Sequence, residues 1–429
     1  MLTKPGSAKT ATAGSRGFQG WKIARAGLVI QMIHSGLVFN AFSFFADELR
    51  TEFGWSKGVL GGAFAMNRAE SGLLGPLQGW MTDRWGSRWV LRLGAVFMAL
   101  GFLAFSQIQT VVQFYLSFLL IALGSSLAGF LTITVTLVHW FERHRSKALA
   151  LASMGFALGG ILAFAVGVTI DAVGWRNTSL IAAIITPLAI LPMAQIFDRR
   201  PADVGLTVDG LDPVDAPAPT KRSESTISTV HFTAREAMRT RAFWFISFGH
   251  ASALLVVGAS MAHLDVFLTD ETSLGSLHRN FVVGTVPLMM GVGQLIGGYL
   301  GDEFDKRIII TIAMLGHGAG LIVLAAASTA PLVWVFVVLH GVAWGLRGPL
   351  QQALRADYFG ATDFGKIMGF SALIIMLGMT TGPIVAGVVA DTTDSFRPAF
   401  VGLGIAAGLG SFWFWFATPP APPVRNVGV

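Results

Sequence analysis

The chain has 429 residues, of which 53% are hydrophobic and only 13% are charged, and its mean hydropathy is +0.64. Because soluble domains carry about 25% charged residues, this composition excludes an ordinary soluble protein and favours one that has lipid as its solvent. The chain contains no cysteine, which excludes disulfides, thiolate catalysis and cysteine-based metal sites.

Apolar runs of about 20 residues follow one another along the chain without the alternation that is typical of barrel strands. Backbone groups in lipid have to pair within their own segment, so we expect these runs to be helices. We predict an all-α integral membrane protein with twelve transmembrane helices in two pseudo-symmetric six-helix bundles, 24–197 and 243–418. The predicted spans are 24–46, 58–81, 90–108, 111–138, 148–170, 178–197, 243–268, 280–301, 308–328, 331–353, 366–390 and 398–418.

Three polar segments flank these bundles, and the basic residues predict on which side of the membrane they lie. Segment 198–242, which contains an Ala/Pro stretch at 213–219, is predicted to be a linker, and 1–23 and 419–429 are predicted to be tails. Placing the N-terminus inside puts 23 of the 30 Lys and Arg residues on the cytoplasmic side, as the positive-inside rule requires. We therefore expect a multi-pass protein of the cytoplasmic membrane with the linker and both termini in the cytoplasm.

A charged, glycine-bearing hinge joins the second and third spans. It contains Gly79, Asp83, Arg84, Gly86 and Arg88. A carboxylate at the C-terminal end of a helix is disfavoured by the helix dipole, so Asp83 needs a compensating partner, and we expect an arginine of this hinge or of the loop after the fourth span. An ion pair that forms in one conformation and breaks in another would be a gate; the alternative is that the arginines only anchor the loop on the cytoplasmic side.

A second copy of the hinge appears 219 positions later, around Asp302, which predicts two related halves. The loop after the fourth span adds an aromatic pair, Trp140 and Phe141, and a basic cluster that includes Arg143 and Arg145. We assign Asp302, Arg143 and Arg145 to the predicted gate together with the first hinge.

These intervals resemble those of the major facilitator superfamily, and the loop after the fourth span resembles that of its monocarboxylate and oxalate/formate porter branch. The Phe53-Gly-Trp-Ser56 and Arg200-Pro-Ala-Asp-Val-Gly-Leu206 stretches look like that branch too. The resemblance implies two six-helix bundles that rock against each other around a site near the membrane midplane. It also implies that spans 1, 4, 7 and 10 line the central cavity.

Ionisable residues within the spans are costly, so each is a candidate functional residue. Arg347 in span 10 is our first candidate for binding a substrate anion, because its guanidinium fork suits a carboxylate. Arg68 in span 2 lies on a face of small residues and is expected to point inward. His34, His250 and His340 lie on spans that the resemblance places at the cavity, and we predict that they contribute to substrate binding. For each of these residues a structural role in helix packing is the alternative.

Three further residues are candidates for proton coupling. Glu70 lies two residues from Arg68 and therefore on a different helix face, so it needs its own partner or a proton. His263 and Asp265 lie near the outer end of span 7, where they would form a proton entry or an outer gate. His317 lies on a span expected to be peripheral, and we interpret it as a packing residue.

The family resemblance has one departure that matters for the substrate. Related porters carry cationic residues within spans 8 and 11, whereas here span 8 has no basic residue after Arg279 and span 11 has only Lys366 at its start. A substrate anion would therefore have to be bound by Arg68 and Arg347.

Several classes of function lack their motifs. There is no phosphate-binding P-loop, no metal-site spacing and no G-x-S-x-G elbow, so we expect no cofactor, no metal and no enzymatic activity. The basic residues are spread over loops and are not interleaved with exposed aromatics, which argues against nucleic acid as a partner. The expected partners are a small organic anion, protons or a counter-anion, and the lipid bilayer.

The sequence thus favours a secondary transporter that moves a mono- or dicarboxylate by alternating access, through proton symport or anion exchange. Proton-coupled efflux of an amphipathic compound is the first alternative, and a membrane sensor or scaffold that transports nothing is the second.

Overall fold

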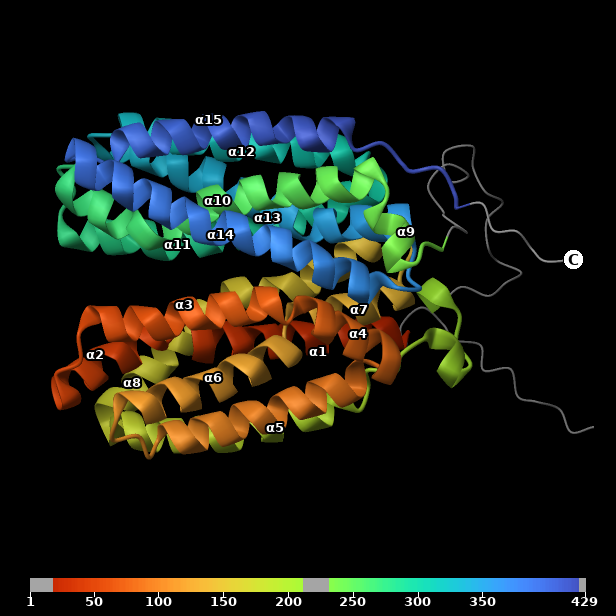
Figure 1. Ribbon diagram of the computed structural model, residues 1–429, viewed down its shortest axis with the longest axis horizontal. Helices are drawn as coiled ribbons and strands as arrows, with labels where there is room; N and C mark the ends of the chain where they lie inside the picture. The colour runs from red at the N-terminus through yellow and green to blue at the C-terminus, as the bar shows by residue number, and fades with distance from the viewer. Residues whose placement is uncertain (1–17, 211–230, 424–429) are drawn as a thin grey trace, which may run out of the picture.

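The structure is a computed structural model that describes residues 18–210 and 231–423; the predictions for 1–17, 211–230 and 424–429 lie outside the described residues. Figure 1 shows two helical bundles lying side by side, one built from α1 to α8 and the other from α10 to α15. We call them the N bundle and the C bundle. No β-strand occurs in the part of the chain that is described.

The N bundle contains the first six predicted spans. Span 1 comprises α1, a π-helical turn η1 and α2; span 2 comprises α3 and α4; span 3 is α5; span 4 comprises α6 and α7; and spans 5 and 6 form α8. The bounds are α1 Gln19–His34, η1 Ser35–Asn40, α2 Phe42–Phe53, α3 Lys57–Leu73, α4 Gly75–Trp85, α5 Ser87–Phe105, α6 Val111–Leu127, α7 Phe130–Trp140 and α8 Arg145–Ala194.

The C bundle contains the last six predicted spans, each as one α-helix. The short η2 (Pro201–Val204), η3 (Val208–Gly210) and α9 (Ala234–Met238) precede it. Its helices are α10 Arg241–Asp270, α11 Ser276–Glu303, α12 Lys306–Ala326, α13 Ala330–Phe359, α14 Phe364–Thr393 and α15 Arg397–Phe416.

The described residues contain ten helices that are long and apolar enough to cross a membrane. One of them, α8, contains both span 5 and span 6, because Gly174 has a φ of 80° and reverses the chain where a loop was expected. Span 2 is divided between α3 and α4, because Pro76 in the first turn of α4 has no N–H to continue the helix. Every predicted span therefore falls on helix, and the predicted all-α membrane fold is confirmed.

The two bundles repeat the same spacing. Four helices of the N bundle begin 219 residues before their counterparts in the C bundle: Lys57 and Ser276, Ser87 and Lys306, Val111 and Ala330, and Arg145 and Phe364. This interval equals the one between the two hinges. Positions 219 apart can therefore be compared directly between the halves.

The bundles meet at the end where α4, α7 and α9 lie in Figure 1. We call this end, which carries Gln19, Ala194, Arg241 and Phe416, the linker end, and the opposite end, with Phe53, the distal end. There α4 packs against α14 and α8 packs against α11. The buried residues Leu131, Val135 and Val138 of α7 form one apolar cluster with Ala356, Phe364 and Met368 of the C bundle.

Glycines permit this contact. A Cβ atom on Gly79 would lie 2.0 Å from the carbonyl oxygen of Gly365, so only glycine lets α4 and α14 approach this closely. Further toward the distal end, a Cβ on Gly72 of α3 would meet the side chain of Met376 on α14 rather than backbone. The contact between the bundles is therefore tightest at the linker end.

Both described ends of the linker are attached to a bundle. The carboxylate of Asp209 accepts hydrogen bonds from the backbone N–H groups of Glu142 (3.1 Å) and Arg143 (2.9 Å), in the loop between α7 and α8. On the other side, Asp363 accepts one from Ala234 N (3.1 Å), at the start of α9. The two described ends of the linker thus bind equivalent loops, one in each bundle.

Candidate functional site

A chain of buried polar side chains runs through the C bundle and has Arg347 at its centre. Arg347 lies on α13 and is only 1% exposed. Its Nε donates to His317 Nε2 of α12 (3.2 Å), and its Nη1 donates to Gln351 Oε1 one turn later (3.2 Å). The predicted substrate-binding arginine is therefore a fixed, desolvated cation inside the bundle.

Two histidines extend this chain toward α10. His317 Nδ1 lies 3.2 Å from His340 Nδ1, and His340 Nε2 lies 3.3 Å from Ser260 Oγ. Both rings are fully buried. His340 was predicted to contribute to substrate binding and His317 to pack, whereas the structure joins both to Arg347. The sequence did not reveal this contact, because His317 lies on a different helix.

A second buried arginine, Arg355, lies two turns beyond Arg347 on α13. Its Nη1 donates to Gln352 Oε1 (3.0 Å), and its Nη2 donates to Ser371 Oγ of α14 (3.0 Å) and lies 3.4 Å from His250 Nδ1 of α10. Sequence reasoning missed Arg355 because the predicted span ended at 353, whereas α13 continues to Phe359. His250, a predicted substrate residue, is a partner of this arginine.

Neither guanidinium forms a salt bridge with a carboxylate among the described side chains; their partners are neutral imidazole, amide, hydroxyl and carbonyl groups. Arg347 Nη2 and Gln351 Nε2 are both buried and have no hydrogen-bond acceptor among the described residues. Buried donors are rarely left unpaired, so these two are candidates for binding a ligand that accepts hydrogen bonds.

Glu70 is the corresponding buried carboxylate of the N bundle. Its Oε2 accepts hydrogen bonds from Ser126 Oγ of α6 (2.7 Å) and Ser71 Oγ (3.2 Å), and its Oε1 is buried without a partner among the described side chains. No described basic side chain pairs with it. Arg68 lies on α3, but its side chain is outside the described part of the structure, so its predicted role stays a prediction.

His34 lies next to this site. Its Nδ1 is 2.7 Å from Ser125 Oγ, and Ser125 and Ser126 are the adjacent residues that hold His34 and Glu70 respectively. Both serines lie in the last turn of α6, just before span 4 breaks at Ala128 and Gly129. The broken helix therefore brings the two candidates to one place.

The structure does not join His263 and Asp265 into one outer site. His263 Nε2 lies 3.0 Å from the carbonyl oxygen of Pro383 on α14. Asp265 is exposed, and its carboxylate forms no hydrogen bond or salt bridge with a described residue. Residues two apart on a helix point in different directions, so these two remain separate candidates.

Asp83 joins the two bundles, although not through an arginine as the sequence suggested. Its carboxylate accepts hydrogen bonds from Gly365 N (3.0 Å) and Lys366 N (2.9 Å), the first backbone groups of α14. Helix N-termini attract negative charge, so the start of α14 supplies the compensation that was expected from a side chain. Of the predicted partners, Arg84 is exposed and Arg88 pairs with Asp198.

Burial raises the pKa of Asp83 to about 6, against the lowering effect of the two backbone hydrogen bonds. Asp83 lies two residues beyond the predicted second span. Its carboxylate therefore titrates close to neutral pH as long as it remains enclosed by α14.

Asp302 makes the equivalent contact in the second half, 219 residues later. It accepts a hydrogen bond from Ser146 N (2.8 Å), at the start of α8, and lies 3.9 Å from Lys147 Nζ. In each bundle an aspartate thus accepts hydrogen bonds from the N-terminus of a helix in the other bundle. Gly86, with a φ of 83°, begins the turn after the first hinge.

Arg145 forms a second salt bridge between the bundles. Its Nη1 lies 2.5 Å from Asp357 Oδ1 of α13, and Asp357 Oδ2 lies 2.8 Å from Lys306 Nζ. Arg143, by contrast, is exposed and contributes only its backbone N–H to Asp209. The structure therefore joins Arg145, but not the side chain of Arg143, to the predicted gate.

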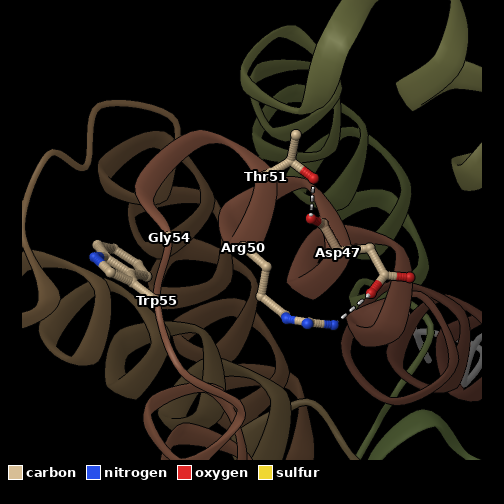
Figure 2. A pocket seen from close by; sticks show the side chains of 5 residues that line it. All are labelled: Asp47, Arg50, Thr51, Gly54 and Trp55. Atoms are coloured by element: carbon tan, nitrogen blue, oxygen red, sulfur yellow. Dashed lines mark hydrogen bonds and ion pairs between the residues drawn. The ribbon is translucent and has the colours of Figure 1, made fainter.

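Two further features of the described residues bear on the location of the site. No cluster of three or more His, Asp or Glu side chains has the arrangement of a metal site. A hollow of about 400 Å³ lies at the distal end of α2, and Figure 2 shows the residues that line it: Asp47, Arg50, Thr51, Gly54 and Trp55. These side chains are largely exposed, and Arg50 pairs only loosely with Asp47 (3.9 Å). The buried clusters around Arg347 and Glu70 are better candidates.

The comparisons with known proteins agree with this architecture. The family profile of the Major Facilitator Superfamily matches residues 28–277 and 246–429, which together include nearly the whole chain. The chain belongs to the major facilitator superfamily. This confirms the resemblance noted in the sequence, and membership places the protein among secondary transporters rather than enzymes.

Among curated relatives, the chain is 26% identical to human monocarboxylate transporter 11 over 94% of this chain and 84% of that protein. It is 24% identical to the hexuronate transporter of Bacillus subtilis, over 90% of each. Among solved structures, it superposes on the human organic anion transporter MFSD10 with a TM-score of 0.70 at 16% identity, covering 92% of this chain and 99% of that one. It also superposes on FucP in the outward conformation with a TM-score of 0.70 at 14% identity, covering 93% and 99%. These structures support the fold alone.

Proposed function

We propose that this protein transports a small organic anion, a mono- or dicarboxylate, across the cell membrane, and that Arg347 binds the carboxylate. The observation that carries the proposal is the pair of buried guanidiniums, Arg347 and Arg355, that no described carboxylate neutralises. A buried charge without a counter-ion is costly. A substrate anion would supply the missing charge, and the unpartnered donors on Arg347 and Gln351 would bind its oxygens.

The relatives support the same substrate class. Two relatives, a monocarboxylate transporter and a hexuronate transporter, are named for carboxylates, and one structural neighbour is an organic anion transporter. We extend this substrate class to the present chain because the charged side chains buried at the centre of its C bundle are cations.

We assign the linker end to the cytoplasm. Most Lys and Arg residues of the sequence fall in segments at this end, as the positive-inside rule requires. Both termini would then be cytoplasmic, and the arrangement in the structure, tightest at the linker end, would be the outward-facing one. Release of Asp83 from α14 and of Asp302 from α8, together with loss of the Arg145–Asp357 bridge, would open the cytoplasmic side.

Glu70 is the carboxylate that we assign to the coupling proton. It is buried, and among the described side chains no cation neutralises it and no donor binds Oε1. A proton on Oε1 would remove the buried charge. If Glu70 is protonated when the anion binds, the proton and the anion would cross the membrane in one cycle. If the proton stays on Glu70, the protein would exchange one anion for another.

Uptake into liposomes tests the proposal. Purified protein is reconstituted, and uptake of radiolabelled mono- and dicarboxylates is measured with and without an inward proton gradient, beside Arg347→Gln. Arg235→Gln is the matched control, because it removes an equal charge from an exposed position on α9. We expect uptake in the wild type and the control and its loss in Arg347→Gln. Absence of uptake for every anion, in folded protein, would contradict the proposal and favour efflux of amphipathic compounds.

A further inference from the structure

The hydrogen bonds around Arg347 have a fixed direction. A guanidinium only donates hydrogen bonds, so His317 Nε2, which lies 3.2 Å from Arg347 Nε, has to be an unprotonated acceptor. Neutral His317 then carries its proton on Nδ1, which lies 3.2 Å from His340 Nδ1. His340 Nδ1 is therefore also an acceptor.

The same reasoning continues to the end of the chain. His340, with Nδ1 unprotonated, carries its proton on Nε2, which lies 3.3 Å from Ser260 Oγ. The Ser260 hydroxyl in turn donates to the carbonyl oxygen of Val257 (3.0 Å). Every N–H and O–H in this chain of hydrogen bonds therefore points away from Arg347 and toward α10, and no donor faces another donor.

A second proton on either ring would break this order. On His317 it would place an N–H against the guanidinium, and on His340 it would place one against the N–H of His317. The titratable groups that face these rings are Arg347 and the other ring of the pair; Arg355, with His250 of α10, lies further along α13. Each of these is basic, and no described carboxylate is present to stabilise an imidazolium.

We infer that His317 and His340 are positioning residues for the anion site, acting through a one-way hydrogen-bond chain that fixes the guanidinium of Arg347. With Nε held by His317 and Nη1 held by Gln351, the donor left unpartnered is Nη2, beside the equally unpartnered Gln351 Nε2. The chain thus determines which edge of the guanidinium a carboxylate meets. Its role in transport depends on the proposed function, whereas the proton positions do not.

Packing supports the chain from both sides. The imidazole of His340 stacks on Phe336, with ring centroids 5.0 Å apart, and meets the His317 ring edge-on at 4.7 Å. Gly320 of α12 lies against the backbone and Cβ of His340, so the two helices approach closely enough for the rings to touch. A peripheral helix, α12, therefore contributes to a site on α13.

The proton positions can be tested directly. Full-length protein with ¹⁵N-labelled histidine is placed in lipid nanodiscs, and the imidazole nitrogen signals are assigned by comparison with His317→Gln and His340→Gln; His278→Gln, at an exposed position on α11, is the control. We expect His317 to be protonated on Nδ1 only and His340 on Nε2 only at pH 7. A proton on His317 Nε2, or a doubly protonated ring at either position, would overturn the inference.

The positioning role is tested by two substitutions of one residue. In His317→Gln the amide oxygen can accept from Arg347 Nε while its NH₂ group donates to His340, so the direction of the chain is kept. In His317→Leu both bonds are lost, and we expect the half-saturation concentration for the anion to rise about tenfold to a hundredfold with the maximal rate changed much less.

The outcomes separate the two claims. His317→Gln should stay within about threefold of the wild type, whereas equal loss in Gln and Leu variants that fold normally would contradict a positioning role. If the wild type transports no anion but the histidines carry the predicted protons, the proposed function fails and the hydrogen-bond chain stands. If the wild type transports and the protons are elsewhere, the inference alone fails.

Discussion

The two bundles share their spacing but differ in the chemistry of their centres. In the C bundle, continuous helices enclose two guanidiniums, and among the described side chains Arg347 Nη2 and Gln351 Nε2 are buried donors without acceptors, beside one acceptor without a donor, Gln294 Oε1. In the N bundle, spans 1, 2 and 4 are interrupted, and Gln31 Oε1, Asn67 Oδ1 and Glu70 Oε1 are acceptors without donors among the described side chains. One half therefore favours an anion, and the other favours a proton or another donor.

Comparing residues 219 positions apart shows where the two bundles differ. Arg347 corresponds to Ala128, which lies in the break between α6 and α7, and Glu70 corresponds to Met289 on α11. Asp83 and Asp302, by contrast, are aspartates at equivalent positions, and both accept hydrogen bonds from a helix N-terminus of the other bundle. Symmetry is thus kept where the bundles have to close on each other and lost where binding and coupling are proposed.

The largest effect is expected in the C bundle. Arg347→Gln should lower anion uptake at least a hundredfold, because a buried charge-assisted contact is lost. Arg355→Gln should cost less, since that guanidinium is already bound by Gln352, Ser371 and His250. Uptake in liposomes at several anion concentrations measures both. An equal loss in the two variants would mean that the arginines act as one charge rather than as a specific site.

Glu70→Gln tests the other half. The amide keeps the shape and the hydrogen bonds to Ser126 but cannot carry a proton, so uptake driven by a pH gradient should be abolished. Counterflow of the anion between equal concentrations should remain within a few fold of the wild type. Loss of counterflow as well would show that Glu70 is needed for anion binding or folding, and the division between the halves would be wrong.

The pH dependence of closure tests what the halves share. Because the pKa of Asp83 is about 6 when enclosed, against 3.8 ordinarily, the closed linker end binds a proton more tightly than an open one. The closed state is therefore most stable below the ordinary pKa of Asp83, 3.8, and it loses this stabilisation as the pH rises through 6. Acidification from pH 7 to pH 5 should favour closure by about 1 kcal/mol.

Spin labels can measure this closure, since the chain has no cysteine of its own. Labels at Arg143 and Glu303, both exposed at the linker end, report the distance between the bundles. The population at short distance should grow at low pH in the wild type, and Asp83→Asn should remove most of that dependence. A dependence that persists unchanged in Asp83→Asn would assign it to another group.

A small effect is expected at the salt bridge between Arg145 and Asp357. Arg145→Gln removes the contact between bundles, but Asp357 keeps Lys306 at 2.8 Å, so its carboxylate is not left unpaired. We expect closure to weaken by about 1 kcal/mol, measured with the same labels. Asp357→Asn, which leaves Arg145 and Lys306 without their shared carboxylate, should weaken it more.

The sequence predicted the parts of the structure that depend on local patterns. Runs of apolar residues predicted every span, and the repeated hinge predicted the two related halves. Isolated charges in those runs pointed to Arg347 and Glu70. The partners of these residues could not be predicted, because they come from other helices: His317 lies on α12, Ser126 on α6, and the amides that bind Asp83 on α14.

Two errors have a common physical cause. Arg355 was counted among the loop cations because α13 continues six residues past the predicted end of its span, and helix ends depend on what packs against them. An arginine was expected for Asp83 because side chains are visible in a sequence, whereas the two backbone N–H groups that bind it exist only once α14 begins beside α4.

The most direct test of the account follows anion and proton in the same liposomes, with a radiolabelled carboxylate outside and a pH-sensitive dye inside. We predict that the wild type acidifies the lumen in step with anion uptake, that Glu70→Gln exchanges the anion without moving protons, and that Arg347→Gln moves neither. Undiminished anion movement in Arg347→Gln would contradict the central claim that the C bundle holds the anion.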